Sequence, residues 1–323
     1  MDLLRFKKKI SFRNLIANLI TIVRHTKKLI EILDQHNVHI IYTNDQSAQL
    51  YGIILKLVTG KKLVWHVRDN QRFRFISFLF CLGSDKILCV SKHILNQIPF
   101  KNRAELVYNG INTDFWKPDS ILNSRTKHKL GLDENVILIG HVGQIIPWKR
   151  HDLFLRIAQE TVESGFENVH FLILGDDRFN EFPECLDYLV SMVESSGLNK
   201  YVTFLGYEAD IRPWLQTIDI FLHLANNEPF GRIAIEAMAF EKPVICFAEG
   251  GPNEVVKNNA SGYLIPSDKP SEVTEKLSFL ISNSNLRREM GISGRNIVKA
   301  NFSLGNLKRI NAVMLEIYEE YFN

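Results

Sequence analysis

The sequence predicts an α/β protein with two doubly wound parallel sheets, and three observations support this. Short apolar runs alternate with helix-length segments along most of the chain, a pattern typical of βα repeats. The 323 residues are enough for two domains. A polar stretch rich in Asn, Ser, Thr, Lys and Asp separates two series of repeats. We therefore expect a first domain over 1–115, a linker over 116–135, a second domain over 136–300 and a closing helix over 301–323.

The composition is that of an ordinary globular protein, with 46% apolar and 23% charged residues. Positive charge gathers at the start, where residues 1–28 hold eight Lys and Arg residues against Asp2 alone. One interpretation of this segment is peripheral contact with an anionic membrane. The more common one is a packing helix with a solvated basic face. We expect no nucleic-acid partner.

Cysteine usage and apolar runs bear on the compartment. The four cysteines show no zinc or thioredoxin-like spacing, and Cys89 and Cys246 lie in apolar strand-like runs that fit buried thiols. No signal peptide is evident, and no apolar run reaches the ~20 residues of a membrane-spanning helix. We expect a cytoplasmic protein that touches the inner face of the membrane peripherally.

The first series of repeats follows the chain in order. Apolar residues at three- and four-residue spacing predict helices, and short β-rich runs predict strands. The expected helices cover 13–35, 48–57 and 73–82, and the expected strands cover 38–42, 62–67, 87–90 and 107–110.

Two features of this first half are candidates for function. His66 and Arg68 stand at the carboxyl end of the strand over 62–67, the edge where open parallel sheets bind ligands. The helix over 73–82 is strongly aromatic. It is either a buried helix or a surface for a lipid-linked acceptor, and the sequence does not separate the two.

The second series repeats the same rhythm after the linker. The expected strands cover 136–142, 169–174, 202–205, 218–225, 243–247 and 263–265, and the expected helices cover 150–164, 186–195, 211–215, 232–240 and 306–321.

The junction between the strand over 218–225 and the helix over 232–240 organises this half. A helix start presents unpaired N–H groups and a positive dipole end, which together bind phosphate. Gly231 lets a ligand approach the backbone there. Glu236 lies about one and a half turns into the helix, where its carboxylate can accept hydrogen bonds from ligand hydroxyls. By themselves, Glu228 and Glu236 are more readily interpreted as solvated surface acids, and the rest of the chain changes that weight.

Other loops reach the same edge of the sheet, because the carboxyl ends of parallel strands meet there. Glycines and Lys suit phosphates, and acids suit sugar hydroxyls, so the set predicts a nucleotide with a sugar attached. Neither a P-loop nor a Gly-x-Gly-x-x-Gly after a strand is present, which argues against an ATP-driven P-loop enzyme and a dinucleotide dehydrogenase. The gathered residues are Gly143, Lys149, Asp176, Glu228, Gly231, Gly250 and Gly251.

At these positions the chain resembles the family 4 retaining glycosyltransferases of GT-B fold, in the group 1 glycosyl transferases. The resemblance runs from about residue 37 to the end and rests on a joint pattern. Its pieces are Glu228-Pro229-Phe230-Gly231, Glu236, Gly250-Gly251, Gly143 with Pro147-Trp148-Lys149, and Tyr108-Asn109-Gly110-Ile111. It implies two Rossmann-like domains facing a cleft, the N-terminal one reduced on the acceptor side and the C-terminal one binding the nucleotide-sugar donor.

The resemblance also implies roles for single residues. Glu236 would bind the ribose hydroxyls, Glu228 would hold hydroxyls of the donor sugar, and Lys149 would neutralise the leaving diphosphate. The implied catalytic residues are Glu228, Lys149 and His66, with Arg68 as the alternative to His66. The implied donor-binding residues are Gly143, Gln144, Lys149, Glu228, Phe230, Gly231, Arg232, Glu236, Gly250 and Gly251.

Two departures from the family stand out. The family has an Arg where this chain has Gln144, so one positive charge on the leaving group is missing, or comes from Arg150 or another residue. The strand, Gly-rich loop and helix that usually open the acceptor domain are also absent. We expect a fragment, a natural reduction, or a partner chain that completes this domain.

The function that follows is a retaining transfer of a hexosyl group from a nucleotide-diphospho-sugar to a hydroxyl. A glycan or lipid-linked acceptor in bacterial surface polysaccharide or glycolipid synthesis is favoured by family tendency and by the basic, aromatic first half. The resemblance implies no cofactor and no metal. The alternatives are a degenerate nucleotide-sugar-binding protein, one subunit of a two-chain transferase, and a nucleotide-sugar epimerase.

Overall fold

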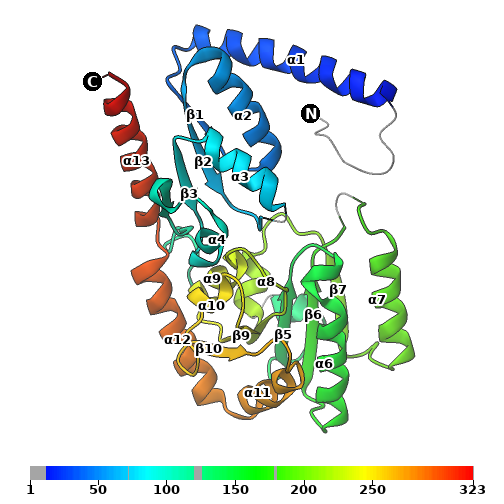
Figure 1. The fold of residues 1–323 in the computed structure, drawn as a ribbon. Coiled ribbons are helices and arrows are strands. Elements are labelled where there is room, and N and C mark those ends of the chain that lie inside the picture. The colour runs from blue at the N-terminus through cyan, green and yellow to red at the C-terminus, as the bar shows by residue number, and fades with distance from the viewer. Residues whose placement is uncertain (1–11, 72, 120–125, 178–179, 323) are drawn as a thin grey trace. The chain divides into compact units, whose positions relative to one another are not determined.

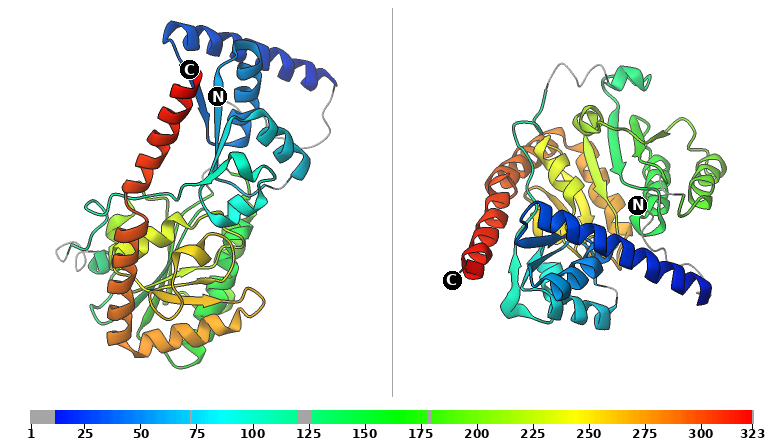
Figure 2. Two further views of the ribbon diagram at one scale, coloured as in Figure 1. Left: turned by 60° about the vertical axis from the view of Figure 1, so that its left-hand side comes forward. Right: turned by 90° about the horizontal axis from the view of Figure 1, so that it is seen from above.

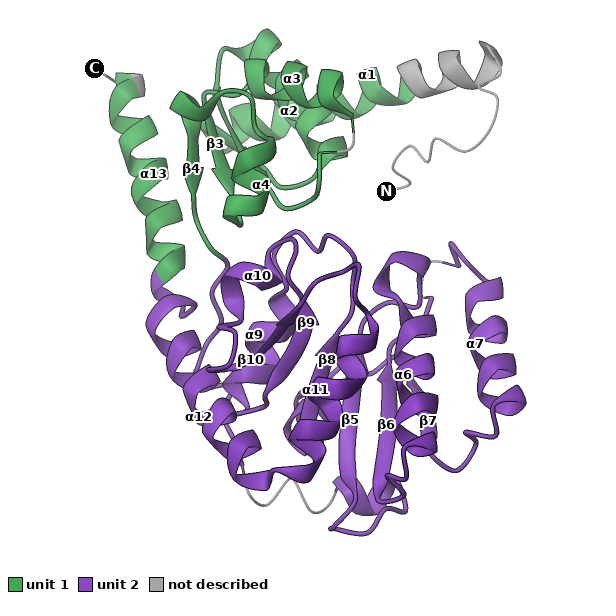
Figure 3. Ribbon diagram, turned by 60° about the horizontal axis from the view of Figure 1, so that its bottom comes forward, with its two compact units in different colours: residues 1–108, 306–323 green, residues 109–305 purple. Residues whose placement is uncertain are grey.

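The chain divides into two units, each with its own parallel sheet. The computed structural model describes residues 12–71, 73–119, 126–177 and 180–322, with side chains described outside 12–19 and 321. The first unit consists of Met1–Tyr108 together with Asn306–Asn323, and the second is Asn109–Gly305 (Figure 3). In the described part of the chain, no helix is both long and apolar enough to span a membrane.

The first unit is a four-stranded sheet in the order β1-β2-β3-β4, and every neighbouring pair is parallel (Figure 1). Its elements are α1 Phe12–Gln35, β1 Ile40–Thr43, α2 Gln46–Thr59, β2 Lys62–Val67, α3 Arg74–Gly83, β3 Lys86–Cys89, α4 Lys92–Gln97, a 3-10 turn at Lys101–Arg103, β4 Ala104–Leu106 and α13 Gly305–Phe322. The predicted helices and strands therefore form, except that the last strand is displaced.

Helices from both ends of the chain cover this sheet. Val313 and Ile317 of α13 pack against one face, on Val64 and Leu88. Residues of α1, such as Leu33, pack instead with the cluster around α2, and Figure 2 shows α1 running crosswise to that helix. Helix α13 thus belongs to the first unit although it follows the second in sequence.

The prediction of a strand over 107–110 is wrong in its position along the chain, because β4 covers Ala104–Leu106 and ends before that range. Val107 still donates its N–H to the Cys89 carbonyl at 2.9 Å, which closes the ladder. Beyond it, Ile111 forms a parallel bridge with Ser303. A Cβ at Gly110 would lie 2.1 Å from the Ser303 carbonyl oxygen, so glycine is required where these two segments meet.

The second unit is a six-stranded parallel sheet in the order β10-β9-β8-β5-β6-β7. Its elements are β5 Ile137–Val142, a 3-10 turn at Pro147–Lys149, α6 His151–Glu163, β6 Val169–Leu174, α7 Glu184–Ser195, β7 Val202–Gly206, α8 Arg212–Thr217, β8 Ile220–His223, α9 Arg232–Ala239, β9 Val244–Phe247, α10 Pro252–Val255, β10 Gly262–Ile265, α11 Ser271–Ser282 and α12 Ser284–Asn301.

This sheet is buried on both faces, as parallel sheets require. All six residues of β6 are buried, so the strand reads as a continuous apolar run and not as an alternating one. One large core packs residues of α6, α7 and α11 against the strands, with Phe154, Phe171 and Leu277 among its fully buried members. Helices α9 and α12 contact each other and the strands of the β10 half.

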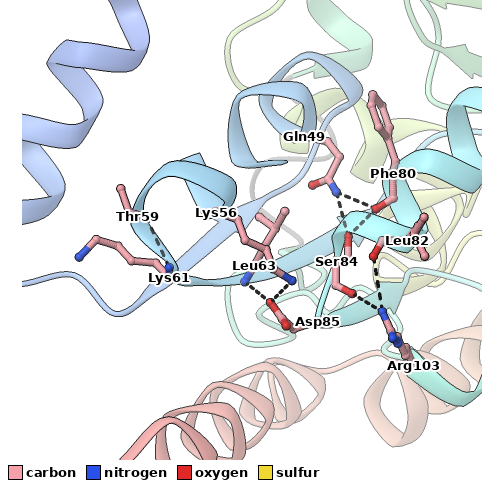
Figure 4. A network of polar contacts seen from close by, with 10 residues as sticks. All are labelled: Gln49, Lys56, Thr59, Lys61, Leu63, Phe80, Leu82, Ser84, Asp85 and Arg103. Atoms are coloured by element: carbon pink, nitrogen blue, oxygen red, sulfur yellow. Dashed lines mark hydrogen bonds and ion pairs between the residues drawn. The ribbon is translucent and has the colours of Figure 1, made fainter. Parts of the chain in front are cut away.

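The same aspartate contact anchors the start of a strand in both sheets. In the first unit Asp85, just before β3, accepts the Leu63 N–H and the Lys56 ammonium, each at 2.8 Å (Figure 4). In the second, Asp219 before β8 accepts the Leu138 N–H at 2.8 Å and the Lys127 ammonium at 3.1 Å. Each aspartate also donates its own N–H to the carbonyl of the residue it binds. Side chain and backbone together fix the register of adjacent strands.

Replacing Asp219 by Ala is expected to lower the free energy of unfolding by about 1 to 3 kcal/mol, because it leaves the Leu138 N–H without its acceptor and removes the carboxylate from the Lys127 ammonium, which keeps its hydrogen bonds to the Glu134 and Val136 carbonyls. Urea unfolding of the whole chain measures the loss. Asp268→Ala, at an exposed residue, is the control and should leave stability unchanged. Equal stability of the two variants would contradict the role of this contact.

Candidate active site

The candidate site lies where the strand order of the second sheet reverses. The chain builds outward from β5 through β6 to β7 and then crosses back to β8, which pairs with the other side of β5 (Figure 3). The loops after β5 and β8 therefore leave the sheet next to each other at its carboxyl edge, the place where doubly wound sheets bind ligands. The first of these loops carries Lys149, and the second carries Glu228.

Lys149 and Glu228 form an ion pair across this point. The Lys149 Nζ lies 2.6 Å from Glu228 Oε2, and their side chains are only 13% and 16% exposed. The Lys149 ammonium also lies 4.2 Å from the centre of the Trp148 ring. The two loops are tied by backbone as well, because Asn226 donates its N–H to the Trp148 carbonyl at 2.9 Å. The pair is thus preorganised by both loops.

Three buried histidines lie beneath this pair. The ring nitrogens of His141 lie 2.8 Å from the Leu222 carbonyl oxygen and 3.0 Å from that of Lys149, which joins β5, β8 and the Lys149 loop. The His151 ring meets His141 edge-on, with centroids 4.5 Å apart. Burial lowers the pKa of His141 to about 4. Burial likewise holds the pKa of His151 and of His223 well below 6.5, and Lys149 contributes to both shifts.

His223 points toward the ion pair. Its Nε2 lies 4.0 Å from Glu228 Oε2, and neither ring nitrogen has a hydrogen-bond partner among the described residues. Since the His223 ring is neutral, the positive charge beside Glu228 comes from Lys149, on the loop after β5. The neutral histidine leaves the charge of the pair to Lys149 and Glu228 alone.

Helix α9 begins at the same edge. Gly231 is its N-cap, with φ at 88°, and no side chain caps the helix start. Phe230 is buried and packs edge-on to Phe302, with centroids 5.8 Å apart. One turn into the helix, Glu236 accepts a hydrogen bond from Arg232 Nε at 2.9 Å. Burial raises the pKa of the Glu236 carboxyl, and Arg232 opposes that rise.

A second glycine loop packs backbone to backbone on the Glu228 loop. Gly251 donates its N–H to the Glu228 carbonyl at 2.8 Å, and Glu249 Oε1 accepts the Asn227 N–H at 3.0 Å. Gly250 has φ at 65°, and a Cβ there would lie 2.4 Å from the Glu228 carbonyl oxygen. Only glycine fits, so the position of Glu228 depends on this loop.

A cavity of about 250 Å³ opens beside Gly143, over the carboxyl ends of β5 and β6. Its lining is Val142, Gly143, Gln144, Leu174, Gly175, Asp176, Tyr207, Glu208 and Ile211. The aliphatic stem of Lys149 lies across Gly143, where a Cβ would be 3.4 Å from Lys149 Cδ. The cavity and the ion pair are therefore adjacent parts of one site.

The structure brings most of the predicted donor-site residues together. Gly143, Gln144 and Lys149 lie on the loop after β5. Glu228, Phe230 and Gly231 lie on the loop after β8, Arg232 and Glu236 lie on α9, and Gly250 and Gly251 lie against Glu228. The roles assigned to these residues stay predictions. Chemically, the helix start and the Lys149 ammonium suit an anion, and the two carboxylates suit hydroxyls.

His66 belongs to the first unit, at the carboxyl end of β2. It is buried, and its Nδ1 is hydrogen-bonded to the Tyr42 hydroxyl, while its Nε2 has no partner among the described residues. Burial lowers the pKa of His66 to about 4, with Arg68 adding to the shift. The ring is therefore neutral near pH 7. Its assignment to the front face of the donor sugar stays a prediction.

Sequence reasoning missed His141, His151 and His223. Each looks like an ordinary core residue in its local pattern, because each sits in or next to an apolar run. The signal that could have found two of them is topological. His141 and His223 lie at the carboxyl ends of β5 and β8, the two strands that flank the reversal.

The fold and this arrangement define a glycosyltransferase of GT-B fold, with one Rossmann-like sheet in each unit. The family model of the glycosyl transferases group 1 matches residues 123–297, just over half of the chain. The chain belongs to this family.

Relatives of known name support the same class. An uncharacterized glycosyltransferase of Methanocaldococcus jannaschii is 26% identical over 283 residues, which cover 83% of this chain and 72% of that protein. The capsular polysaccharide biosynthesis glycosyltransferase CapM of Staphylococcus aureus is 25% identical, covering 85% and 76%. The human alpha-1,3/1,6-mannosyltransferase ALG2 is 35% identical over 156 residues, but these cover only 47% of this chain and 37% of that protein.

Solved structures show the same fold at lower identity. HepE of Anabaena, solved in complex with UDP, superposes with a TM-score of 0.82 at 22% identity, covering 90% of this chain and 81% of that one. A glycosyltransferase from Rickettsia africae superposes with a TM-score of 0.80 at 22% identity, covering 100% and 86%.

The buried histidines predict a stability that falls with acidification. The pKa of His66 and of His141 is lowered from 6.5 to about 4 on folding, so between these pH values the unfolded chain binds protons that the folded protein does not. The free energy of unfolding should therefore fall as the pH drops below about 6.5, by about 2 kcal/mol per histidine at pH 5.

Urea unfolding at pH 7.5 and pH 5 measures this difference. His141→Gln should reduce it, because the variant has no proton to take up at that position. His128→Gln, at an exposed histidine, is the matched control and should leave it unchanged. A His141→Gln variant with the full wild-type pH dependence would refute the explanation.

Proposed function

We propose that the chain transfers a hexosyl group, with retention, from a nucleotide-diphospho-sugar to a hydroxyl of a glycan or lipid-linked acceptor. The observation that carries this proposal is the Lys149–Glu228 ion pair beside the start of α9. Membership of the glycosyl transferases group 1 supports the reaction class. HepE, of the same fold, has been solved with UDP and with UDP-glucose.

In the proposed donor complex, the diphosphate lies at the helix start against Lys149, and Glu236 accepts the ribose hydroxyls. Glu228 exchanges its contact with Lys149 for hydroxyls of the sugar. The cavity beside Gly143 takes the base, since it adjoins the Lys149 loop. Lys149, Glu228 and Glu236 then each have a partner on the ligand.

The proposed step needs no protein nucleophile. The bond between the anomeric carbon and the diphosphate oxygen breaks, and the acceptor oxygen forms its bond to the same face of that carbon. The acceptor proton passes to an oxygen of the leaving phosphate. Lys149 and the N–H groups of α9 stabilise the charge that develops on the diphosphate, an electrostatic effect fixed before the reaction. No metal ion is required for this role.

The acceptor side of the proposal rests on the first unit. Helix α3 presents an apolar face to solvent, with Phe75 73% exposed. The interpretation of α3 as a buried helix is thus wrong for most of its length, since only Ser77, Phe80 and Cys81 are buried. The exposed residues are Phe73, Phe75, Ile76, Phe78, Leu79 and Leu82. A patch of this kind indicates a lipid or protein partner.

Basic residues adjoin this face. Arg74 is exposed in the first turn of α3, and Arg103 donates to the Ser84 carbonyl at 3.2 Å, just beyond the end of the helix. An apolar helix face beside basic side chains suits an anionic membrane surface. The contact predicted for residues 1–28 falls largely outside the described residues, although Ile20 and Val23 of α1 are exposed. CapM, a relative named for capsular polysaccharide biosynthesis, supports a glycan as the acceptor.

Replacing Lys149 by Ala is expected to lower kcat for sugar transfer by about 100-fold or more, because it removes a preorganised charge from the leaving group. Transfer from labelled UDP-, GDP-, ADP- and CDP-sugars to a lipid-linked acceptor extract measures it, with the anomeric configuration read by NMR. Lys257→Ala, an exposed lysine of the same unit, is the control.

Wild-type binding of a nucleotide-sugar without transfer would favour the binding-protein alternative. An acceptor-independent change of the nucleotide-sugar would favour the epimerase. An inverted anomeric product would overturn retention.

The double variant Phe75→Ser/Leu79→Ser is expected to lose binding to vesicles of anionic phospholipid, because two large apolar side chains leave the α3 face. Co-sedimentation with vesicles at low and physiological salt measures it. Phe279→Ser/Ile292→Ser, at exposed apolar residues of the second unit, is the matched control. Equal sedimentation of both variants would remove α3 from the membrane contact.

A further inference from the structure

Both cations at the proposed donor site are held by carboxylates in this structure. Lys149 lies on Glu228, and Arg232 lies on Glu236 at 2.9 Å. Each pair is neutral as a whole, and Gln144 on the neighbouring loop has no charge. An incoming diphosphate therefore meets no free positive side chain among these residues. It must release one from its carboxylate.

In the Arg232–Glu236 pair, the Arg232 side chain is the one that is free to move away. The Glu236 side chain is 8% exposed and fixed within α9, whereas the Arg232 side chain is 66% exposed. Within the described residues, Glu236 is the sole partner of the guanidinium, which binds it through Nε alone. The planar fork of the guanidinium is thus left open for a second, bidentate partner.

The position of Arg232 is unfavourable for helix stability alone. It is the first residue of α9, next to the Gly231 N-cap, and the first turn contains no acidic residue. A cation there opposes the positive end of the helix dipole, and an Arg placed before its Glu at i,i+4 is the weaker orientation. A bound anion at the helix start would reverse that penalty.

Arg150 does not share these features. Its guanidinium is paired with Asp152 Oδ1 at 3.2 Å, and it precedes α6, a different helix. It is 30% exposed, so it has less freedom to move than Arg232.

We propose that Arg232 is the second phosphate-binding cation of the donor site and that it couples recognition of the ribose to recognition of the diphosphate. As ribose hydroxyls donate to Glu236, they replace the Arg232 hydrogen bond. The released guanidinium turns to the diphosphate at the start of α9. A nucleoside alone would break the ion pair with no phosphate to receive the cation, so the site selects nucleoside diphosphates. This inference rests on the proposed function.

Isothermal titration with UDP, GDP, ADP, CDP and the four corresponding nucleosides tests it on wild type, Arg232→Ala, Arg232→Lys and Arg150→Ala. For the diphosphate that wild type binds, Arg232→Ala should weaken affinity about 10- to 100-fold, the usual range for one charge-assisted contact. Affinity for the matching nucleoside should stay equal or rise. Arg232→Lys should recover part of the diphosphate affinity, and Arg150→Ala should match wild type.

A rescue variant supplies an independent measurement. Arg232→Ala/Gln144→Arg places a cation on the loop that carries Gly143, and it should regain diphosphate affinity without changing nucleoside affinity. Thermal unfolding of each variant checks that it is folded, and Arg232→Gln replaces Arg232→Ala if that variant is not.

Three results would overturn the inference while leaving the proposed function intact. The first is an Arg232→Ala variant that binds the diphosphate as tightly as wild type. The second is an Arg232→Ala variant that loses affinity for the nucleoside and for the diphosphate equally, and the third is an Arg150→Ala variant that loses as much diphosphate affinity as Arg232→Ala. Wild type that binds none of the four diphosphates would instead overturn the proposed function and this inference with it.

Discussion

The reversal of strand order between β5 and β8 is the constraint on which the candidate site depends. It makes β5 and β8 neighbours, so that Lys149 on the loop after β5 meets Glu228 on the loop after β8. It also brings the carboxyl ends of β5 and β8 side by side, so that the ring nitrogens of His141 lie next to the carbonyl oxygens of Leu222 and Lys149, and the neutral ring donates its one N–H to one of these two. A change in the pairing of β5 with β8 would therefore move the ion pair, the buried histidines and the start of α9 together.

Burial then decides how charge is distributed within the site. The histidines under the ion pair are neutral because the sheet and α6 exclude water from them. The formal charges are left on Lys149, Glu228, Arg232 and Glu236, which neutralise one another in pairs. No unpaired charge is then buried among these four side chains, which would be costly. In the proposed donor complex, hydroxyls and phosphates of the ligand exchange with these ion pairs.

The sequence predicted the architecture well and the site in part. Strongly periodic or continuous apolar runs, such as Val169–Leu174, marked the strands because burial on both faces leaves no other pattern. The prediction of a strand over Val107 to Gly110 was wrong, because the strand ends at Leu106. The following residue Ile111 pairs instead with Ser303, almost 200 positions away in the sequence. His223 could not be found locally, since its importance comes from the strand order. The exposure of α3 was also undecided, because an apolar helix looks the same whether protein or solvent covers it.

The two sheets show how strand order and not strand chemistry sets what a unit can do. Asp85 and Asp219 anchor their strands by the same pair of backbone and side-chain contacts, so both units are assembled alike. In the described residues, the first sheet advances in one direction from β1 to β4 and the second reverses. In the second sheet, the loops after several strands therefore lie together at the carboxyl edge, on either side of the reversal. The first has no such reversal among these strands, and its distinctive groups are His66 with Tyr42 at one strand end and the apolar face of α3. The proposed division of labour follows from this difference, with the acceptor assigned to the first unit and the charged donor to the loops of the second.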